Sequence, residues 1–427
     1  MNNKTALVLA GGGSRGAYEL GVWKALKKLG IKIDIITGTS VGALNGVLFS
    51  AGDEKRAEKM WAEISTDLVL NCNLEIDMTT PESQKASIYN LVTEAIRQKA
   101  IDQTPLKTLL NDVVDKQTFF KSDVDFGTVI VKHPSLKHVY VQKKDMNEDN
   151  LIEYLMATSA CYPAMKPYKF DNETYIDGGY YDNLPINLAI EMGAKNIISV
   201  DLGAIGLTQA INEKSEINHT KIYPSQDLGF FMIFDKDVSK DLIEKGYYDT
   251  LKIYREYDGF KYTFTKNTFS NMYNDFQNLI KELSTITEKQ GVLSFVPFIN
   301  TIQSKIEKAV KQQYQNNSKT QLGFIACCEA AGEVFDIPKN QTYSYLKFIS
   351  VIKLAFISAQ REAELKKIDP SELLNGFDDS KIVCVHIWRL IDEILKEKKS
   401  SVLFNALSQI FPTQTLAAIF IFMITLF

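Results

Sequence analysis

The chain has 427 residues and is 45% hydrophobic, which is enough for two or three domains that each bury a core. A formal net charge of −4 argues against a nucleic-acid-binding protein, which presents a strongly basic surface. Five cysteines show neither C-x-x-C spacing nor a disulfide framework, so the sequence predicts reduced thiols and a cytoplasmic location.

The first 50 residues predict two strand–loop–helix units. Residues 5–10 form an apolar run of strand length, too short for a signal-peptide core, and a helix that Gly30 ends follows the glycine-rich loop at 11–16. Residues 33–37 are a β-branched second strand, followed by a second helix. Such a pair requires a parallel sheet, and we expect both loops to meet at its carboxyl edge.

The second loop reads Gly38-Thr39-Ser40-Val41-Gly42. A Gly-x-Ser-x-Gly pattern at a strand-to-helix turn exposes the serine hydroxyl on a strained backbone, because side chains at 38 and 42 would crowd the turn. The positive end of the following helix points toward Ser40, where negative charge would develop during acyl transfer. Ser40 is therefore the candidate nucleophile.

The first loop consists of Gly11, Gly12, Gly13, Ser14, Arg15 and Gly16. A dinucleotide-binding loop would need an acidic residue at the end of the second strand, and a Walker loop would need Gly-Lys-Ser/Thr; the chain has neither. Two interpretations remain for these residues alone. The loop is either a tight turn or an oxyanion hole, whose backbone N–H groups face a tetrahedral oxyanion.

Residues 54–122 predict helices, interrupted by Pro81 and Pro105, and we interpret them as a cap or lid. The remaining elements of this part are strands at 126–132, 137–142, 174–176 and 195–202, helices at 148–157 and 184–192, and a helix that ends near Gly246. Beyond about residue 259 glycine becomes rare, and helices are predicted at 267–290, 299–315, 321–334, 342–366 and 381–398.

A candidate base follows the strand at 174–176, in the motif Asp177-Gly178-Gly179. A serine at its normal pKa needs a base within hydrogen-bond reach, and none of the four histidines lies in a glycine-flanked loop. A carboxylate can serve instead if it is partly desolvated and held by backbone N–H groups. As an isolated motif, Asp-Gly-Gly is also typical of a plain turn.

Together these motifs resemble the patatin-like phospholipases, which combine a Gly-Gly-Gly-x-Arg-Gly loop, a Gly-x-Ser-x-Gly turn and an Asp-Gly-Gly/Ala motif. The family's Ser-x-x-x-Pro block is matched by Ser159 to Pro163. The resemblance covers about residues 1–258. It implies a three-layer α/β/α domain with a mostly parallel sheet, and residues 259–427, which we expect to form an all-α domain, have no counterpart in it.

The resemblance also implies the roles of the motif residues. Ser40 would be the nucleophile and Asp177 the general base of a dyad without histidine. The other positions are the oxyanion loop at Gly11 to Gly16, the nucleophile turn at Gly38 and Gly42, and the base loop at Gly178 and Gly179. The candidate oxyanion donors are the N–H groups of Gly12, Gly13, Ser14 and Val41. We expect Arg15 to hold the loop rather than to bind a phosphate.

The implied function is hydrolysis of phospholipids or lysophospholipids through an acyl-serine intermediate, with no metal or other cofactor and no nucleic acid. Two alternatives remain open: an acyltransferase that uses the same dyad, and a non-catalytic lipid-binding scaffold. An α/β-hydrolase fits less well, because its serine turn follows several strands and its acid is followed by a histidine, for which only His219 is near.

The last residues, 416–427, are apolar and uncharged. Twelve helical residues span about 18 Å, which is less than the roughly 30 Å hydrocarbon core of a bilayer. The tail therefore either packs as a final core element or inserts part-way into a leaflet, with Lys396, Lys398 and Lys399 near anionic head groups. Peripheral attachment to the inner face of a membrane is thus an open alternative to a free cytoplasmic protein.

Overall fold

A computed structural model describes residues 3–72, 74–212, 216–269, 272–288, 319–367, 372–375, 377, 379–399 and 401–426. Contacts divide the chain into two compact units, Met1–Leu251 and Lys252–Phe427, here called the N-terminal and the C-terminal unit. The boundary predicted from composition, between 258 and 259, lies close to this division. The helix predicted at 299–315 lies outside the described residues.

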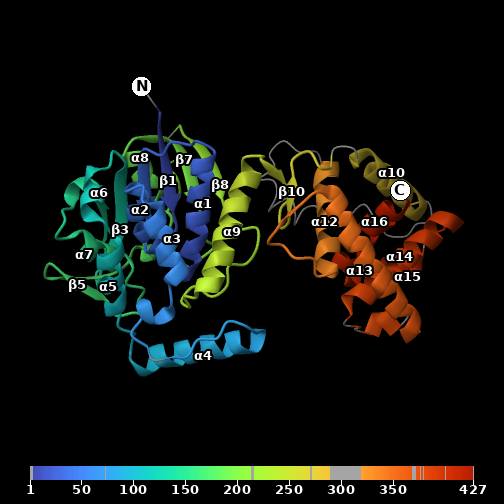
Figure 1. Cartoon of the computed structure of the whole chain (residues 1–427), viewed down its shortest axis with the longest axis horizontal. Coiled ribbons are helices and arrows are strands. Elements are labelled where there is room, and N and C mark those ends of the chain that lie inside the picture. The colour runs from blue at the N-terminus through green and yellow to red at the C-terminus, as the bar shows by residue number, and fades with distance from the viewer. Residues whose placement is uncertain are drawn as a thin grey trace. The chain divides into compact units, whose positions relative to one another are not determined.

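The N-terminal unit is built on one eight-stranded sheet (Figure 1). Its strands are β1 (Lys4–Leu9), β2 (Ile35–Gly38), β3 (Asp125–Lys132), β4 (His138–Gln142), β5 (Tyr168–Phe170), β6 (Glu173–Asp177), β7 (Ala194–Val200) and β8 (Asn218–Ile222). The order is β5-β6-β3-β2-β1-β7-β8, with β4 paired to β3. Strands β3, β2, β1, β7 and β8 are mutually parallel, whereas β4 and β6 run antiparallel to β3. The predicted mostly parallel sheet is confirmed, although β5 and β8 were not predicted.

Helices accompany this sheet, and all of them but α4, which extends away from it, lie in the body of the unit (Figure 1). They are α1 (Ala17–Lys28), α2 (Val41–Ser50), α3 (Glu54–Glu63), α4 (Pro81–Arg97), α5 (Thr104–Val113), α6 (Lys116–Lys121), α7 (Leu151–Thr158), α8 (Ile186–Glu191) and α9 (Lys236–Ile253). The prediction that a helix ends near Gly246 is wrong, because α9 continues to Ile253. Gly246 instead allows a close crossing with α1, since a Cβ there would lie 2.0 Å from the Tyr18 carbonyl oxygen.

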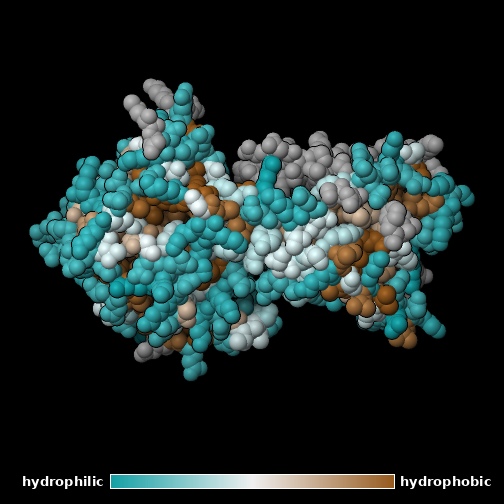
Figure 2. Space-filling view, turned by 45° about the horizontal axis from the view of Figure 1, so that its top comes forward, coloured by the Kyte–Doolittle hydropathy of each residue, from teal (hydrophilic) through white to brown (hydrophobic). Residues whose placement is uncertain are grey.

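The predicted cap range, 54–122, consists of α3 to α6 and their connections. Trp61 of α3, Leu110 of α5 and Phe119 of α6 are almost fully buried, which ties these three helices to the body of the unit. Helix α4 buries only Ser87 and Leu91. A lid function for this range stays a prediction. On the visible face of the N-terminal unit, hydrophilic residues surround smaller apolar patches (Figure 2).

The C-terminal unit is mainly helical. Its described helices are α10 (Tyr273–Glu288), α12 (Lys319–Val334), α13 (Tyr345–Lys366), α14 (Ser380–Glu397), α15 (Val402–Ile410) and α16 (Pro412–Leu426). A small sheet of β9 (Tyr257–Asp258), β10 (Thr263–Thr265) and β11 (Thr342–Tyr343) accompanies them, so the unit is not strictly all-α.

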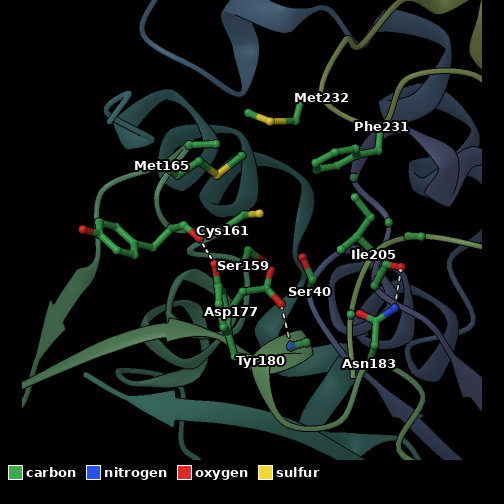
Figure 3. Close-up of a pocket in the computed structure, with 18 of the residues that line it drawn as sticks. Ser40, Ser159, Cys161, Met165, Asp177, Tyr180, Asn183, Ile205, Phe231 and Met232 are labelled. Atoms are coloured by element: carbon green, nitrogen blue, oxygen red, sulfur yellow. Dashed lines mark hydrogen bonds between the residues drawn. The ribbon is translucent and has the colours of Figure 1, made fainter. Parts of the chain in front are cut away.

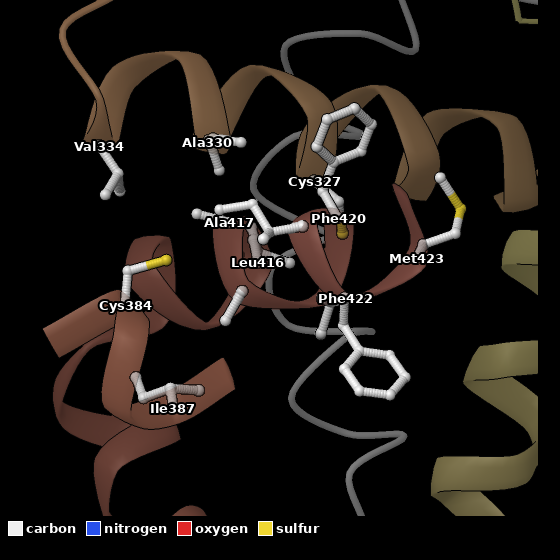
Figure 4. Packing of buried hydrophobic residues seen from close by; sticks show 14 of the residues in the cluster. Cys327, Ala330, Val334, Cys384, Ile387, Leu416, Ala417, Phe420, Phe422 and Met423 are labelled. Atoms are coloured by element: carbon white, nitrogen blue, oxygen red, sulfur yellow. The ribbon is translucent and has the colours of Figure 1, made fainter. Parts of the chain in front are cut away.

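The apolar tail forms α16, which packs against α12 and α14. Its residues from Leu416 to Ile424 are at most 7% exposed and belong to the core of the unit. Figure 4 shows Phe420 and Leu416 facing α12, which carries Cys327 and Ala330. The packing interpretation of the tail is therefore confirmed. Among the described helices, no single one is both long and apolar enough to cross a membrane; only α15 with Pro412–Thr425, bent by 120°, reaches that length and composition.

Candidate active site

The serine turn has the strained geometry that the sequence predicts. Ser40 lies between β2 and α2 with φ 53° and ψ −128°, a positive φ that is rare for a residue with a side chain. A Cβ at Gly38 would lie 2.3 Å from the Gly42 carbonyl oxygen, and one at Gly42 would lie 2.5 Å from that of Leu9. Both glycines are therefore required sterically, and the turn presents Ser40 to a cavity.

Asp177 ends β6 and lines the same cavity, whose volume is about 450 Å³ (Figure 3). Its side chain is only 6% exposed and accepts a hydrogen bond of 2.8 Å from the Gly179 N–H. Burial raises the pKa of Asp177 to about 6, while hydrogen bonds from the Gly179 N–H and the Ser40 side chain oppose that rise. The structure thus brings Ser40 and Asp177 together, although 137 positions separate them in the sequence.

The last residue of α7 and the two residues after it hold both loops in place. The Thr158 hydroxyl accepts a 3.1 Å hydrogen bond from the Ser40 N–H and donates one of 2.6 Å to the Val129 carbonyl oxygen. Two residues on, the Ala160 carbonyl oxygen accepts a 2.9 Å hydrogen bond from the Asp177 N–H. Sequence reasoning missed Thr158, since nothing local distinguishes it from other helix-end threonines.

The glycine-rich loop at 11–16 lies beside Ser40, because β1 and β2 are parallel neighbours and pair Leu9 with Gly38. The Ser14 N–H donates to the Phe231 carbonyl oxygen at 2.7 Å, so the proposal of Ser14 as an oxyanion donor is corrected. The Gly11 N–H is likewise bound, to the Asn183 carbonyl oxygen at 3.1 Å. In the described part of the chain, no acceptor takes the N–H groups of Gly12 and Gly13, which both line the cavity.

Arg15 holds neighbouring loops, which confirms the preferred interpretation of this residue. Its Nε donates to the Gly229 carbonyl oxygen at 2.9 Å, and its Nη1 donates to those of Leu202 and Gly203 at 3.2 and 2.8 Å. The guanidinium is thus bound to backbone carbonyl groups, and Arg15 is not among the residues that line the cavity.

Asn183 is a cavity residue that the sequence did not indicate. Its side-chain Nδ2 donates to the Gly11 carbonyl oxygen at 3.2 Å (Figure 3). Its main-chain carbonyl oxygen accepts a hydrogen bond from the Gly11 N–H. Asn183 therefore fixes the first residue of the glycine-rich loop relative to the base loop. Gly179 of the base loop also lines the cavity, whereas Gly178 packs under it against β3.

None of the four histidines, all of them described, lines the cavity. His219 lies on β8, where its Nε2 is 2.8 Å from the Ser199 hydroxyl, and burial lowers its pKa to about 4. His386 is buried in α14 of the C-terminal unit. Within the described residues, no three His, Cys, Asp or Glu side chains gather so that they could hold a metal ion.

The cavity wall is mostly apolar. Its apolar residues include Tyr162, Pro163, Met165, Ile205, Leu207, Phe231, Met232 and Phe234. A second, smaller pocket of about 50 Å³ also reaches Ser40 and is bounded by Trp61, Leu106 and Leu110. This arrangement can place a reactive hydroxyl and a carboxyl base against an apolar ester in a partly water-excluded site.

Comparison with known proteins finds similarity to one family over part of the chain. The model of the family described as "Patatin-like phospholipase" matches residues 7–190. Patatin-like phospholipase domain-containing protein 7 of Rattus norvegicus is 30% identical over 217 residues, which are 49% of this chain and 14% of that protein. Lysophospholipase NTE1 of Candida albicans is 28% identical over 208 residues, which are 48% of this chain and 13% of that protein. The chain therefore aligns with only a small part of these relatives.

Solved structures show weaker likeness. The crystal structure of VipD from Legionella pneumophila has 12% sequence identity and a TM-score of 0.38, with 98% of this chain and 91% of that chain covered.

Proposed function

We propose that this chain, whose residues 7–190 match the model of the patatin-like phospholipases, hydrolyses acyl esters of phospholipids or lysophospholipids through a Ser40–Asp177 dyad. One observation carries the proposal. The strained Ser40 and the buried Asp177 line the same mostly apolar cavity, the Ser40 side chain lies close enough to lower the pKa of Asp177, and no described histidine lines this cavity. The relatives named as phospholipase-domain proteins and as a lysophospholipase support the substrate class.

The first half-reaction forms an acyl-enzyme. Asp177 accepts the proton of the Ser40 hydroxyl while the serine oxygen attacks the ester carbonyl carbon. The resulting oxyanion is stabilised by the N–H groups of Gly12 and Gly13, with the Val41 N–H at the start of α2 as a further candidate. Collapse of the intermediate breaks the ester bond, and the alcohol leaves with the proton from Asp177.

The second half-reaction releases the acid. Asp177 takes a proton from water, which attacks the acyl carbon, and the fatty acid leaves as the proton returns to Ser40. A base with a pKa of about 6 is ionised at neutral pH, and its pKa lies closer to neutral pH than the pKa of an ordinary aspartate does. Burial of Asp177 therefore suits it to proton transfer in both steps.

Exposed apolar side chains support contact with a lipid surface. Ile205 and Leu207 line the cavity and are 93% and 60% exposed, although they belong to the apolar residues that a folded chain tends to bury. Contact of this cavity edge with a membrane would deliver a lipid ester to Ser40 without full transfer through water. A peripheral, cytoplasmic protein is consistent with this arrangement.

Turnover of a lysophospholipid by wild type and Ser40→Ala tests the proposal. We expect Ser40→Ala to lose about 10⁴-fold or more in kcat/KM, because the reaction then has no nucleophile. A fluorophosphonate should label wild type only, and the melting temperature should stay close to that of wild type. Activity or labelling that persists in Ser40→Ala would contradict the assignment. Acyl transfer to added glycerol, in place of fatty acid release, would identify an acyltransferase.

A further inference from the structure

A buried serine next to the dyad has no role in the reaction described above. Ser159, which follows α7, is 6% exposed and lines the cavity close to Ser40 and Asp177 (Figure 3). Within the described residues, its hydroxyl has no hydrogen-bond partner. Buried polar groups in native proteins are nearly always paired, so an unpaired hydroxyl on a residue that lines the cavity of the proposed dyad indicates a ligand contact that a turn of the side chain would complete.

The position of Ser159 is determined on both sides. The preceding residue, Thr158, binds the Ser40 N–H through its hydroxyl, and the following residue, Ala160, binds the Asp177 N–H through its carbonyl oxygen. Ser159 therefore has little freedom to move relative to the dyad. The backbone is held in this way, and the Ser159 hydroxyl needs only a rotation about its Cα–Cβ bond to reach a substrate.

Ser159 also lies where the two cavities meet. The residues that line both the large cavity and the small apolar pocket are Gly13, Ser40, Ser159, Met165 and Phe234. Because Ser40 is the attacking residue, the shared region is where the reacting ester must lie. Ser159 thus faces the part of the substrate next to the scissile bond rather than a distant head group or chain end.

The charge of the cavity indicates what Ser159 can bind. No lysine or arginine is among the described residues that line the large cavity, and Asp177 would repel a phosphate. A neutral partner is therefore required. A serine hydroxyl can both donate and accept, which matches an alcohol or ester oxygen.

We propose that the Ser159 hydroxyl hydrogen-bonds the glycerol oxygen adjacent to the scissile ester. In a lysophospholipid this oxygen is a free hydroxyl group, and in a diacyl lipid it is the oxygen of the second ester. The proposal rests on the proposed function, since it assumes that Ser40 attacks a glycerol ester. Ser159 is then a positioning residue that favours glycerolipids over simple esters.

A pair of substrates tests the contact. One is a short-chain lysophosphatidylcholine below its critical micelle concentration, and the other is the analogue that lacks the free glycerol hydroxyl. We expect wild type to prefer the first in kcat/KM by about tenfold, the usual value of one neutral hydrogen bond. In Ser159→Ala this preference should fall to about one. If Ser159→Ala also loses kcat/KM selectively on the short-chain diacyl lipid, the proposed contact extends to the oxygen of the second ester.

Ser50→Ala is the matched control. Ser50 is also a buried serine, 2% exposed, but its hydroxyl donates to the Gly46 carbonyl oxygen within α2, away from the cavity. Its removal should leave the substrate preference at the wild-type ratio. The inference is overturned if Ser159→Ala keeps the wild-type ratio, or if wild type shows no preference.

Binding without turnover separates this inference from the proposed function. Calorimetry on Ser40→Ala should show about tenfold tighter binding of the hydroxyl-bearing lipid than of the analogue, and Ser40→Ala/Ser159→Ala should bind both equally. Equal affinities in Ser40→Ala would overturn the role of Ser159. If wild type hydrolyses neither lipid, the proposed function fails, while the binding measurement still decides whether Ser159 contacts the glycerol oxygen.

Discussion

Each unit of the chain buries a carboxyl group, and the two have different surroundings. Glu329 of the C-terminal unit is 5% exposed, and its carboxylate accepts the N–H groups of Phe260, Lys261 and Tyr262 at 2.6, 3.1 and 3.2 Å. Asp177 of the N-terminal unit is 6% exposed, and among the described residues the Gly179 N–H is the backbone group that donates to its carboxylate. Burial raises the pKa of both groups.

The difference lies in what completes each hydrogen-bond set. Backbone donors surround Glu329, so its carboxylate ties the segment at 260–262 to α12. Asp177 instead faces a cavity and the hydroxyl of Ser40, so one of its partners can react. Burial is therefore common to the proposed base and to a structural carboxyl group, and the feature that distinguishes Asp177 is its place beside a cavity and a serine hydroxyl.

The largest expected effect comes from exchanging each carboxylate for its amide. Asp177→Asn should lower kcat/KM by about 10³- to 10⁴-fold, because an amide cannot accept the serine proton. The variant should be at least as stable as wild type at neutral pH, since it removes a buried charge. Esterase kinetics and thermal unfolding measure both quantities.

Glu329→Gln should behave in the opposite way. The amide has one acceptor oxygen, so at least one backbone N–H in the segment at 260–262 loses its partner, at a cost of about 1–3 kcal/mol. The melting temperature should fall while turnover of a short-chain ester persists at a temperature where the variant is folded. If Asp177→Asn stayed active, or if Glu329→Gln abolished activity without unfolding, the contrast between the two groups would fail.

The next effect concerns the core of the C-terminal unit. Phe420 of α16 is fully buried, with its ring centroid 5.8 Å from that of Phe324 in α12. Phe420→Ala should cost about 3–5 kcal/mol of unfolding free energy, as expected for an aromatic core residue. Denaturant unfolding measures this cost. A variant with unchanged stability but weaker liposome binding would instead support the membrane-anchor interpretation of the tail.

The smallest effect is the pH dependence of activity. Asp177 must be ionised to accept a proton, so kcat/KM should fall about tenfold per pH unit below about pH 6 and level off above it. The contribution of Asp177 to folding stability should change in the opposite direction, and decrease as the pH rises. Because the folded-state pKa is raised, the contribution of Asp177 is fully present below about pH 4 and is lost as the pH rises through about 6.

Asp182→Asn is the control for this titration. Burial also raises the pKa of Asp182 to about 6, but its carboxylate accepts the Tyr140 hydroxyl at 3.3 Å and does not line the cavity. The fall in kcat/KM at acid pH should persist in Asp182→Asn. Its disappearance would assign this fall to Asp182.

The sequence by itself was sufficient for features that depend on near neighbours. The alternation of strands, glycine loops and helices predicts the parallel sheet, and the two glycines around Ser40 predict a crowded turn. These predictions succeed because the steric demand and the residues that meet it lie within a few positions of each other.

Only the tertiary structure decided features that depend on distant partners. Ser14 is excluded as an oxyanion donor by the Phe231 carbonyl oxygen, the raised pKa of Asp177 comes from its burial, and Ser159 is identified by the lack of a partner. Likewise, Gly246 lies where α9 crosses α1 and not at a helix end, because the Tyr18 carbonyl oxygen leaves no room for a Cβ there. Hydrogen-bond partners, desolvation and close packing come from residues far apart in the chain, and local sequence carries no record of which of them will meet.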